Sequence, residues 1–586
     1  MTTTTFFVEA PPRWRAFVRA RETSLVLIAL VVGMLGGVLV AGMSAAVNLL
    51  HMAFFNIHYG ERLSAQPSID PWRALIVPTA GGFLLGLSLL LVQRFRPKRE
   101  IDPIEANALH GGRMSFRGSI IVALQTIWSS GVGASVGLEA GYTQLVSGVA
   151  ASIGRAFHLR RADQRTIVGC GAAAAIAGAF EAPLAGAFYA FELIVGGYTP
   201  ASLTPIGVSA LGGFVVAKYF SPLTLGIVVN QIGEVRGRDL AIATLLGVLA
   251  ALTGIIIMRG VALIEAGLAK IRLWPPLRPA LGGLVVGALA LVTPQVMSSG
   301  HGALHMNSMV APPVLFIITV YALKIIASMV SLGSGFRGGL FFASLLLGAL
   351  GGEMFAKGLN VVWPWLLLDP TLYSVVGMGA LSASVIGGPL TMTFIALEAT
   401  GNLWLTTAVL IAVIISTQIT RELFGYSFAT WRMHLRGETI RSAADIGWIR
   451  DLTVAALMRR DFATVELGTS IGDFREKFPL ATWSQVVAVD AKGDYAGIIV
   501  VADAHGASDH KVSSLNDILR ARTTTLLPQM NIQQAAAAFD QAEAEALAVV
   551  ESAEQPKVVG LLTEAYTLRR YAEESEKRRR SLSGEL

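Results

Sequence analysis

The sequence predicts an all-α polytopic membrane domain built from two similar halves and followed by a smaller soluble α/β region. Hydrophobic residues make up 53% of the chain, charged residues 15%, and the mean hydropathy is +0.59. This composition excludes an ordinary soluble protein. The 61 glycines are typical of helices packed closely in lipid, where small residues let backbones approach one another.

Basic residues flank the apolar part of the chain. Arg13 and Arg15 precede the first apolar segment, and residues 578–580 are three consecutive arginines near the end. Because lysine and arginine collect in cytoplasmic segments, we expect residues 1–22 to be a basic cytoplasmic N-terminus. Both termini are then cytoplasmic, and the chain is a multi-pass protein of the cell membrane. The apolar run over 24–50 exceeds the core of a signal peptide.

The apolar segments fall into two series, separated by a charged link over residues 225–238. Several are shorter than the ~20 residues that a straight span needs, so we expect helices that stop within the membrane near Gly137 and Pro183. In transporters the ends of such helices meet at midplane and form ion sites. The segments are 24–54, 72–92, 119–128, 143–157, 166–190 and 204–219, then 240–269, 277–296, 312–330, 340–355, 373–394 and 403–422.

The second series repeats the first. Gly137 recurs as Gly338, and five residues recur after a displacement of 206 positions. A chance match between glycine-rich segments is disfavoured because most of the coinciding positions are not glycine. We therefore predict membrane repeats over 23–224 and 239–432, of undetermined relative sense. The five pairs are Pro183 with Pro389, Leu184 with Leu390, Phe188 with Phe394, Ala190 with Ala396, and Glu192 with Glu398.

The composition changes after the membrane repeats. Short β-like runs alternate with helical ones and charges become common, which predicts two small α/β modules. Residues 470–471 before one predicted helix match residues 531–532 before another. The expected divisions are a linker over 433–450, modules over 451–508 and 509–571, and a charged tail over 572–586.

Glu139 is the main candidate functional residue. The stretch 129–141, SSGVGASVGLEAG, places this single carboxylate among small residues. A charge at membrane depth is costly unless it faces a cavity or a partner. The first turn of a helix has free N–H groups that attract anions, so a carboxylate there competes with an anion until it is protonated. The alternative is a structural glutamate paired with an arginine or with backbone donors.

These residues resemble the CLC family of chloride channels and proton-coupled chloride exchangers, with a C-terminal pair of cystathionine-β-synthase-type (CBS) domains. The resemblance implies an inverted repeat, a homodimer, and a pore for chloride or another small anion in each lipid-embedded subunit. GLEAG at 137–141 resembles the family's G-[KR]-E-G-P, which implies that Glu139 is the gating glutamate. It also implies anion binding at Gly137, Leu138 and Glu139. Leu138 replaces the basic residue and Gly141 the proline.

A second motif resembles the family's loop G-x-F-x-P. It is GSGFRGGLFFA at 333–343, where the resemblance implies that the backbone amides of Leu340 and Phe341 bind chloride. Gly338 and Gly339 would be the glycines at the helix break, and Arg337 is an added cation.

A third motif, FGYSFATWR at 424–432, resembles the segment that supplies a tyrosine hydroxyl to the anion, which implies this role for Tyr426. The alternative for Tyr426 is a tyrosine of the membrane interface.

A fourth resemblance places Glu100 where the family has a pore serine, because Asp102-Pro103 matches the end of G-S-G-I-P. Arg99 and Ile101 then replace the flanking glycines. A carboxylate 4 Å from an anion is repelled by about 4 kcal/mol at an effective dielectric of 20. We therefore expect that Glu100 points away, is protonated, or that the register differs.

The segment APLAGAFYAFEL, residues 182–193, bears on the mode of transport. Exchangers of the family commonly carry an internal proton-delivering glutamate just after a structural one. By the resemblance, Glu192 is the structural residue and Leu193 replaces the proton carrier. An apolar side chain cannot relay a proton, which favours a passive, proton-sensitive gated anion channel. The alternatives are a proton-coupled antiporter that uses water or another acid such as Glu181, and a non-conducting sensor or scaffold.

No enzyme, metal centre, required cofactor or nucleic-acid partner is indicated. The catalytic and nucleotide-binding motifs HExxH, P-loop and dinucleotide fingerprint are missing from the sequence. His301 and His305 lack an accompanying acid, and Cys170 is the single cysteine. An adenine nucleotide at the CBS pair is a further expectation, with Asp503 and Thr563 as contacts. Val500 and Tyr566 replace their usual partners, so a role in dimer stability or gating is equally expected.

Overall fold

The structure is a computed structural model in which the chain forms two compact units, Met1–Asp445 and Ile446–Leu586. Their boundary falls within the expected linker 433–450. Parts of the predicted linkers, and the predicted boundary between residues 508 and 509, lie outside the described residues. The structure describes residues 9–15, 22–58, 60–96, 99–220, 233–271, 273–309, 312–434, 452–506, 514–552 and 554–583.

The first half of the membrane unit consists of helices, several of them short. Proline stands at the first position of α3, α4, α8 and α9, where a missing N–H costs nothing. The elements are α2 (Glu22–Phe55), η1 (Leu63–Ala65), α3 (Pro71–Phe95), α4 (Pro103–Leu109), α5 (Phe116–Gly131), α6 (Glu139–Ala156), α7 (Arg161–Phe180), α8 (Pro183–Tyr189), the π-helical η2 (Ala190–Val195) and α9 (Pro200–Phe220).

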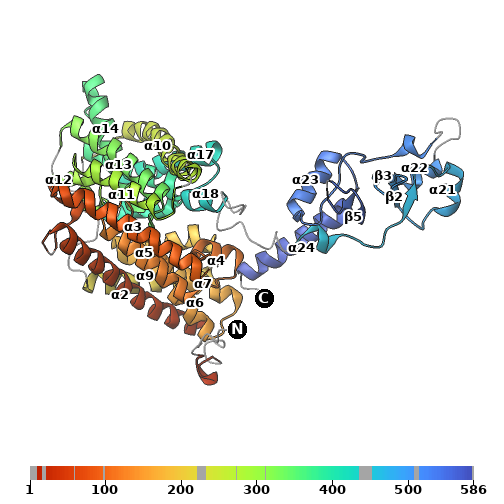
Figure 1. Ribbon diagram of the computed structural model, residues 1–586, viewed down its shortest axis with the longest axis horizontal. Helices are drawn as coiled ribbons and strands as arrows, with labels where there is room; N and C mark the ends of the chain where they lie inside the picture. The colour runs from red at the N-terminus through yellow and green to blue at the C-terminus, as the bar shows by residue number, and fades with distance from the viewer. Residues whose placement is uncertain are drawn as a thin grey trace. The chain divides into compact units, whose positions relative to one another are not determined.

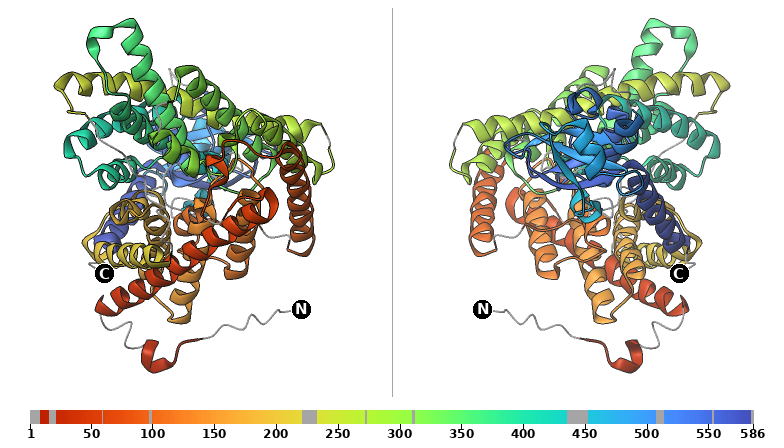
Figure 2. Two further views of the ribbon diagram at one scale, coloured as in Figure 1. Left: turned by 90° about the vertical axis from the view of Figure 1, so that its left-hand side faces the viewer. Right: turned by 90° about the vertical axis from the view of Figure 1, so that its right-hand side faces the viewer.

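The second half of the membrane unit also consists of helices, several of them short. In Figure 1 the red to yellow helices of the first half and the green to teal helices of the second form two adjoining bundles, as they do in Figure 2. The elements are α10 (Gly237–Lys270), α11 (Leu277–Ala290), η3 (Pro294–Val296), α12 (His301–Met309), α13 (Val314–Ser334), α14 (Phe341–Val362), η4 (Pro364–Leu366), α15 (Pro370–Ile386), α16 (Pro389–Thr400), α17 (Leu403–Leu423) and α18 (Phe428–His434).

Seven helices among the described residues are long and apolar enough to cross a membrane. They are α2, α3, α9, α10, α13, α14 and the run Leu403–His434. Helices such as α8 and α16 are too short to cross a bilayer. The expectation of broken helices is therefore confirmed.

The duplication is confirmed by helix packing. In the first half α2 packs on α7 and α9, and in the second half α10 packs on α15 and α17. Likewise α6 packs on α7, and α14 on α15. Across the halves, α3 packs on α11 and α8 on α16, so equivalent helices meet at the interface between the repeats.

The predicted apolar segment 166–190 is divided near Pro183, where the sequence predicts a helix break. Helix α7 ends at Phe180, and Glu181 takes the left-handed conformation with φ of 54°. Pro183 then starts α8, because proline cannot donate the hydrogen bond that would continue α7. The chain therefore turns back within the fold at this point.

Glu192 is a structural cap. Its carboxylate accepts hydrogen bonds from the backbone amides of Leu390 (2.8 Å) and Thr391 (2.9 Å) at the start of α16, and from the Thr391 hydroxyl (2.6 Å). The first amides of a helix have no partner within the helix, so this carboxylate satisfies two of them. The structural role interpreted from the sequence agrees with these contacts.

Glu398 makes the reciprocal contact. Its carboxylate accepts from the amides of Leu184 (2.8 Å) and Ala185 (2.9 Å) at the start of α8. Each half thus caps the short helix of the other, as expected for two units related by a twofold axis. The recurrence of Glu192 as Glu398 in the sequence therefore corresponds to this reciprocal capping.

The C-terminal unit consists of two α/β modules, which confirms the predicted class. In one sheet β1 is parallel to β2 and β2 antiparallel to β3, and in the other β4 is antiparallel to β5. The elements are α20 (Val454–Leu457), β1 (Thr464–Glu466), α21 (Ile471–Lys477), β2 (Gln485–Val489), β3 (Tyr495–Val500), α22 (Val501–Gly506), η5 (Leu515–Ile518), α23 (Ile532–Ala542), β4 (Ala546–Val550), β5 (Val558–Thr563) and α24 (Glu564–Ser583).

The two modules are interleaved, whereas the sequence predicted two consecutive blocks. Val454 and Leu457 pack in the core of the second module with Leu547 and Leu562. Leu515 packs in the core of the first module. Because hydrophobic pattern does not say which core a segment enters, this exchange was not predictable from the chain order. The predicted tail continues α24 up to Ser583.

We predict that Glu192→Ala lowers the stability of the membrane unit by about 1–3 kcal/mol, because buried amides of α16 lose their acceptor. Thermal unfolding of the purified protein in detergent measures this. Glu422→Gln is the matched control, since Glu422 is an exposed carboxylate bonded only to the Gln418 side chain among the contacts described. A Glu192→Ala protein with unchanged melting temperature would contradict the capping role.

Candidate functional site

The starts of α6 and α14 meet at a two-residue antiparallel bridge between the halves. The amide of Gly137 donates to the carbonyl of Gly339 (2.9 Å), and the amide of Gly339 donates to that of Gly137 (3.1 Å). A Cβ at Gly338 would lie 2.6 Å from the Cβ of Val136, so only glycine allows this approach. The glycines predicted at the breaks therefore hold two helix starts side by side.

Both helix starts lack a side-chain cap. Leu138 and Leu340 occupy the N-cap positions, and neither side chain can accept a hydrogen bond from the first turn. The first amides of each helix therefore keep their partial positive charge. Two such starts facing one place form a site for an anion.

The Glu139 carboxylate lies at these helix starts. Glu139 is 5% exposed, and a Cβ at Gly339 would lie 3.5 Å from its Oε2. Its carboxylate interacts with the backbone amides of Glu139 itself and of Phe342. Among the described residues it forms no ion pair, and Oε2 has no hydrogen-bond partner. Of the structural alternative drawn from the sequence, pairing with an arginine is therefore excluded within this part of the chain, whereas pairing with backbone donors agrees with these contacts.

Aromatic rings surround the site. Phe180 packs against Phe341 and Phe342, with ring centroids 4.5 and 5.4 Å apart. His301 stacks on Phe342 at 4.1 Å. Apolar walls exclude water and strengthen the electrostatic effect of the helix starts. The His301 ring has this packing role, and no group of metal-ligating side chains occurs among the residues that the structure describes.

Tyr189 is a neighbour of the site that the sequence analysis did not single out, whereas the contacts described for Tyr426 are with other residues. The Tyr426 hydroxyl hydrogen-bonds His434 Nδ1 (3.0 Å), and its ring stacks on the same histidine. Tyr189 on α8 instead packs near Phe341, with ring centroids 6.1 Å apart, and is an electrostatic neighbour of Glu139. Sequence reasoning missed Tyr189 because it stands among ordinary apolar residues. Anion binding by Tyr426 stays a prediction.

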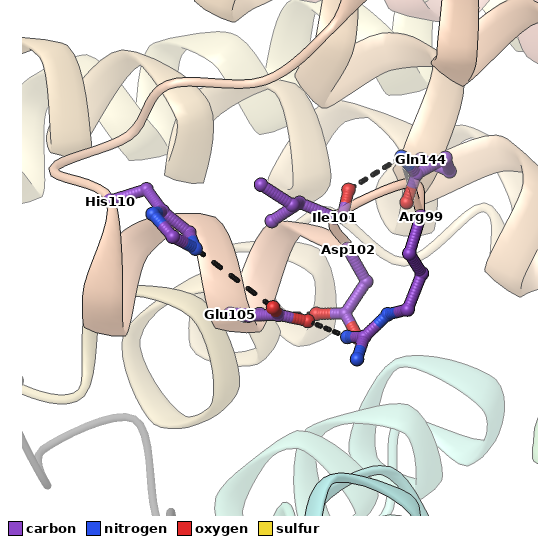
Figure 3. Close-up of polar contacts among 6 residues, drawn as sticks. All are labelled: Arg99, Ile101, Asp102, Glu105, His110 and Gln144. Carbon is purple, nitrogen blue, oxygen red and sulfur yellow. Dashed lines mark hydrogen bonds and ion pairs between the residues drawn. The ribbon is translucent and has the colours of Figure 1, made fainter. Parts of the chain in front are cut away.

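The start of α4 differs from those of α6 and α14, because a carboxylate caps it (Figure 3). The amide of Glu105 donates to Asp102 Oδ1 (2.9 Å). The Glu105 carboxylate accepts from Arg99 and lies 3.9 Å from His110 Nε2. The carbonyl of Ile101 accepts from the Gln144 side chain (2.9 Å), which ties the loop to α6.

Glu100 does not lie at the start of α4. Its carboxylate pairs with Arg96 (3.7 Å) and packs against Gly118 on α5. Burial raises the pKa of this carboxyl, and Arg96 opposes the effect. Of the three expectations for Glu100, the first agrees with this placement: the side chain points away, and Asp102 occupies the helix start.

Arg62 is a cation that sequence reasoning missed. It lies in the loop between α2 and α3 and packs against Gly302 of α12. Tyr142 is an electrostatic neighbour of both Arg62 and Glu139. Burial lowers the pKa of the Arg62 guanidinium to about 10, while Tyr142 and Glu181 oppose the shift, so Arg62 is charged at neutral pH. Because Arg62 and Tyr142 are 80 positions apart in the chain, their proximity leaves no local signal in the sequence.

Leu193 lies in an apolar cluster. It is 9% exposed and packs with Ala151, Val168 and Ala172. The neighbouring Glu192 is engaged at α16. The position that the resemblance assigned to proton delivery is therefore apolar in its surroundings as well as in its own side chain.

The candidate nucleotide contacts lie in the C-terminal unit. The Asp503 carboxylate pairs with Arg520 (2.6 Å), and Thr563 ends β5, where its carbonyl accepts from the Thr567 hydroxyl (2.9 Å). Asp503 would have to leave Arg520 to bond a ribose. Nucleotide binding by these residues stays a prediction.

Comparison with known proteins agrees with this geometry. A family model described as "Voltage gated chloride channel" matches residues 81–421, more than half of the chain. The voltage-gated ClC-type chloride channel ClcB of Escherichia coli (strain K12 / DH10B) is 33% identical over 402 residues, which cover 68% of this chain and 96% of the relative. The ClcB of Escherichia coli (strain SMS-3-5 / SECEC) matches to the same extent. The protein belongs to the CLC family.

Solved structures share the fold. The slow cyanobacterial Cl⁻/H⁺ antiporter has a TM-score of 0.62 at 22% identity, covering 70% of this chain and 97% of its own. A eukaryotic CLC transporter has a TM-score of 0.61 at 18% identity, covering 94% and 98%. Its match extends over the C-terminal unit. Relatives named as channel and as antiporter therefore share one architecture.

We predict that Arg62→Gln weakens anion binding to the purified protein a few-fold, because one charge at 4 Å contributes about 1 kcal/mol in water. Calorimetric titration with chloride at low ionic strength measures the effect, which should shrink as inert salt screens the charge. Arg73→Gln is the control, since Arg73 is a cation near the start of α3 that pairs with Asp70 (3.9 Å). Equal losses in both variants would argue against a specific role for Arg62.

Proposed function

We propose that this protein is a passive anion channel that carries chloride and opens on protonation of Glu139. The observation that carries the proposal is the pair of uncapped helix starts joined at Gly137 and Gly339, with the Glu139 carboxylate between them. Protein dipoles fixed in this way replace part of the hydration shell of an anion. The amides beyond Leu138 and Leu340 are the proposed ligands.

Glu139 acts as the gate in this proposal. An ionised carboxylate at the two helix starts repels an incoming anion and takes its place. A protonated Glu139 has no charge to hold it there, so its side chain leaves and an anion enters. Transport therefore rises as pH falls.

The passive mode is supported by Leu193 and by the place of Glu181. Leu193 packs beside Val168 near the start of α7, whereas Glu181 follows the end of the same helix. The thirteen residues from Val168 to Phe180 span about 18 Å of helix. Glu181 is in addition paired with Lys218 (3.6 Å). It therefore does not replace an acid at Leu193.

The proposed protein is a homodimer in the cell membrane, with one pore in each subunit and cytoplasmic termini. Arginines at the ends of the helices near the N-terminal segment support this orientation. The amide of Ala10 donates to the carbonyl of Ala156 (3.1 Å), so the N-terminal segment lies at the end of α6 opposite Glu139. Arg155, Arg160 and Arg161 gather at that end, as the positive-inside tendency predicts for a cytoplasmic face.

We expect chloride efflux from liposomes containing the purified protein without coupled proton movement. Recording chloride and pH in the same sample tests this. The wild type should conduct faster at low pH, and Glu139→Gln should conduct at all pH values because its side chain carries no charge. Glu422→Gln is the control. Protons driven uphill by a chloride gradient would contradict the passive mode, and no flux at any pH would favour the sensor or scaffold alternative.

We also predict that Gly137→Ala weakens the pH dependence of transport. A Cβ at Gly137 would overlap Glu139 Oε2, the far end of a flexible side chain, so the carboxylate should be pushed from the helix starts. The double variant Gly137→Ala with Glu139→Ala should conduct like Glu139→Ala alone if the effect passes through the carboxylate. Gly42→Ala is the control, because its Cβ would meet nothing within 4 Å. If the two substitutions change transport in a strictly additive way, the effect of Gly137→Ala does not pass through the Glu139 carboxylate.

A further inference from the structure

A basic cavity lies at the end of α6 that is opposite Glu139. It has a volume of about 950 Å³ and is formed by the end of α4, the loop that follows, the end of α6 and the start of α7. This is within the size range of ligand pockets in proteins. The anion path proposed above does not use it.

The lining is positively charged. Arg113, Arg155 and Arg161 line the cavity together with His110 and His158, and no carboxylate residue is among the lining residues. Arg113 and Arg155 lie close enough to repel each other, and Arg161 likewise repels Arg165 outside the cavity. Like charges gathered in one concave place favour the binding of an anion there.

The nearby carboxylates are engaged at the rim. Glu105 accepts from Arg99 and lies 3.9 Å from His110 Nε2, on the wall that Figure 3 shows. Glu9 lies 3.0 Å from Arg15 and 3.5 Å from His158. These carboxylates pair with the two histidines of the lining. Arg113 and Arg161 form no ion pair with a carboxylate that the structure describes at salt-bridge distance.

The walls are fixed by buried hydrogen bonds. Gln164 donates from Nε2 to the carbonyls of Gly112 (3.0 Å) and Ala151 (3.1 Å), which joins the loop to α6. Asn107 donates to the carbonyl of Arg165 (3.0 Å), which joins α4 to α7. The cavity is therefore preformed rather than a gap between mobile segments.

Gly111 positions one of the arginines. It adopts a φ of +59°, and a Cβ there would lie 2.8 Å from Arg161 Nε. Glycine thus allows the Arg161 guanidinium to lie along the loop at the cavity. Gly112 follows with φ of +77°, so the loop turns sharply around this side chain.

Arginines at a cytoplasmic helix end also have a topological explanation. That explanation requires only that arginines lie on the cytoplasmic face, and it does not require them to meet at one cavity. Arg117 and Arg160 fit it, since neither of them lines the cavity. Arg113, Arg155 and Arg161 instead come from three separate segments to one cavity. Several guanidinium groups around one space are suited to phosphate, whose oxygens accept paired hydrogen bonds from each.

We propose that this cavity binds a phosphate-bearing anion, held by Arg113, Arg155 and Arg161. Basic pockets between membrane helices on the cytoplasmic side take lipid headgroups in this way. A soluble phosphate compound has the same chemistry. The test measures binding to the folded protein, so it does not depend on transport.

The test uses the full chain in nanodiscs and measures its melting temperature. One arm titrates inorganic pyrophosphate into phosphatidylcholine nanodiscs. The other compares nanodiscs that contain phosphatidic acid with nanodiscs of matched charge that contain phosphatidylglycerol, whose phosphate is a diester. A ligand that binds the folded state raises the melting temperature. Stabilisation by pyrophosphate supports a soluble source, and stabilisation by phosphatidic acid alone supports a lipid headgroup.

Arginine variants show whether the phosphate-bearing anion binds in this cavity. Arg113→Gln and Arg161→Gln should each weaken the apparent affinity about tenfold or more, since a hydrogen bond to a charged group is lost. Arg161→Lys keeps the charge without the paired donors and should weaken binding less. Arg117→Gln and Arg160→Gln should bind as the wild type does. Stabilisation in neither arm, or equal losses in lining and control variants, would overturn the proposal.

Discussion

The structure depends on the meeting of two uncapped helix starts. Helices α6 and α14 come from different repeats, and two hydrogen bonds between Gly137 and Gly339 hold their ends together. Their free amides concentrate positive partial charge in an apolar environment. The fold can keep such charge only if an anion or a carboxylate is present, and Glu139 supplies the carboxylate. In the proposed function Glu139 is also the gate, so that stability and gating involve the same group.

The amides at the starts of the short helices α8 and α16 are satisfied in another way. The starts of α8 and α16 also leave amides without intrahelical partners, and these are satisfied permanently by Glu398 and Glu192. The chain thus contains glutamates at helix starts of two kinds. Glu192 and Glu398 reach across to the opposite repeat and are fully engaged, whereas Glu139 stands on its own helix with one oxygen lacking a partner. The first two carboxylates are held by the opposite repeat, and the proposed gate is the carboxylate that is not.

Several departures from the family pattern are compensated elsewhere in the fold. Leu138 replaces a basic residue, while Arg62 brings a charged guanidinium to the neighbourhood of Tyr142. The expected pore serine is missing, and Asp102 caps α4 instead. The second departure is the larger one, because a carboxylate at a helix start takes the place that an anion would occupy. The start of α4 therefore differs chemically from the helix starts around Glu139.

The sequence by itself determined the membrane class, the duplication, the position of the helix breaks, the place of Glu139 at a helix start and the structural role of Glu192. These follow from hydrophobic length, from glycine and proline at breaks, and from residues that recur at a fixed displacement, all of which are local or periodic signals. Only the tertiary structure decided that Arg62 and Tyr189 lie near the site, that Glu100 turns toward α5, and that segments of the two C-terminal modules are exchanged. Each of these depends on contacts between residues far apart in the chain, where packing selects the partner and composition does not. The convergence of three arginines on one cavity is of the same kind.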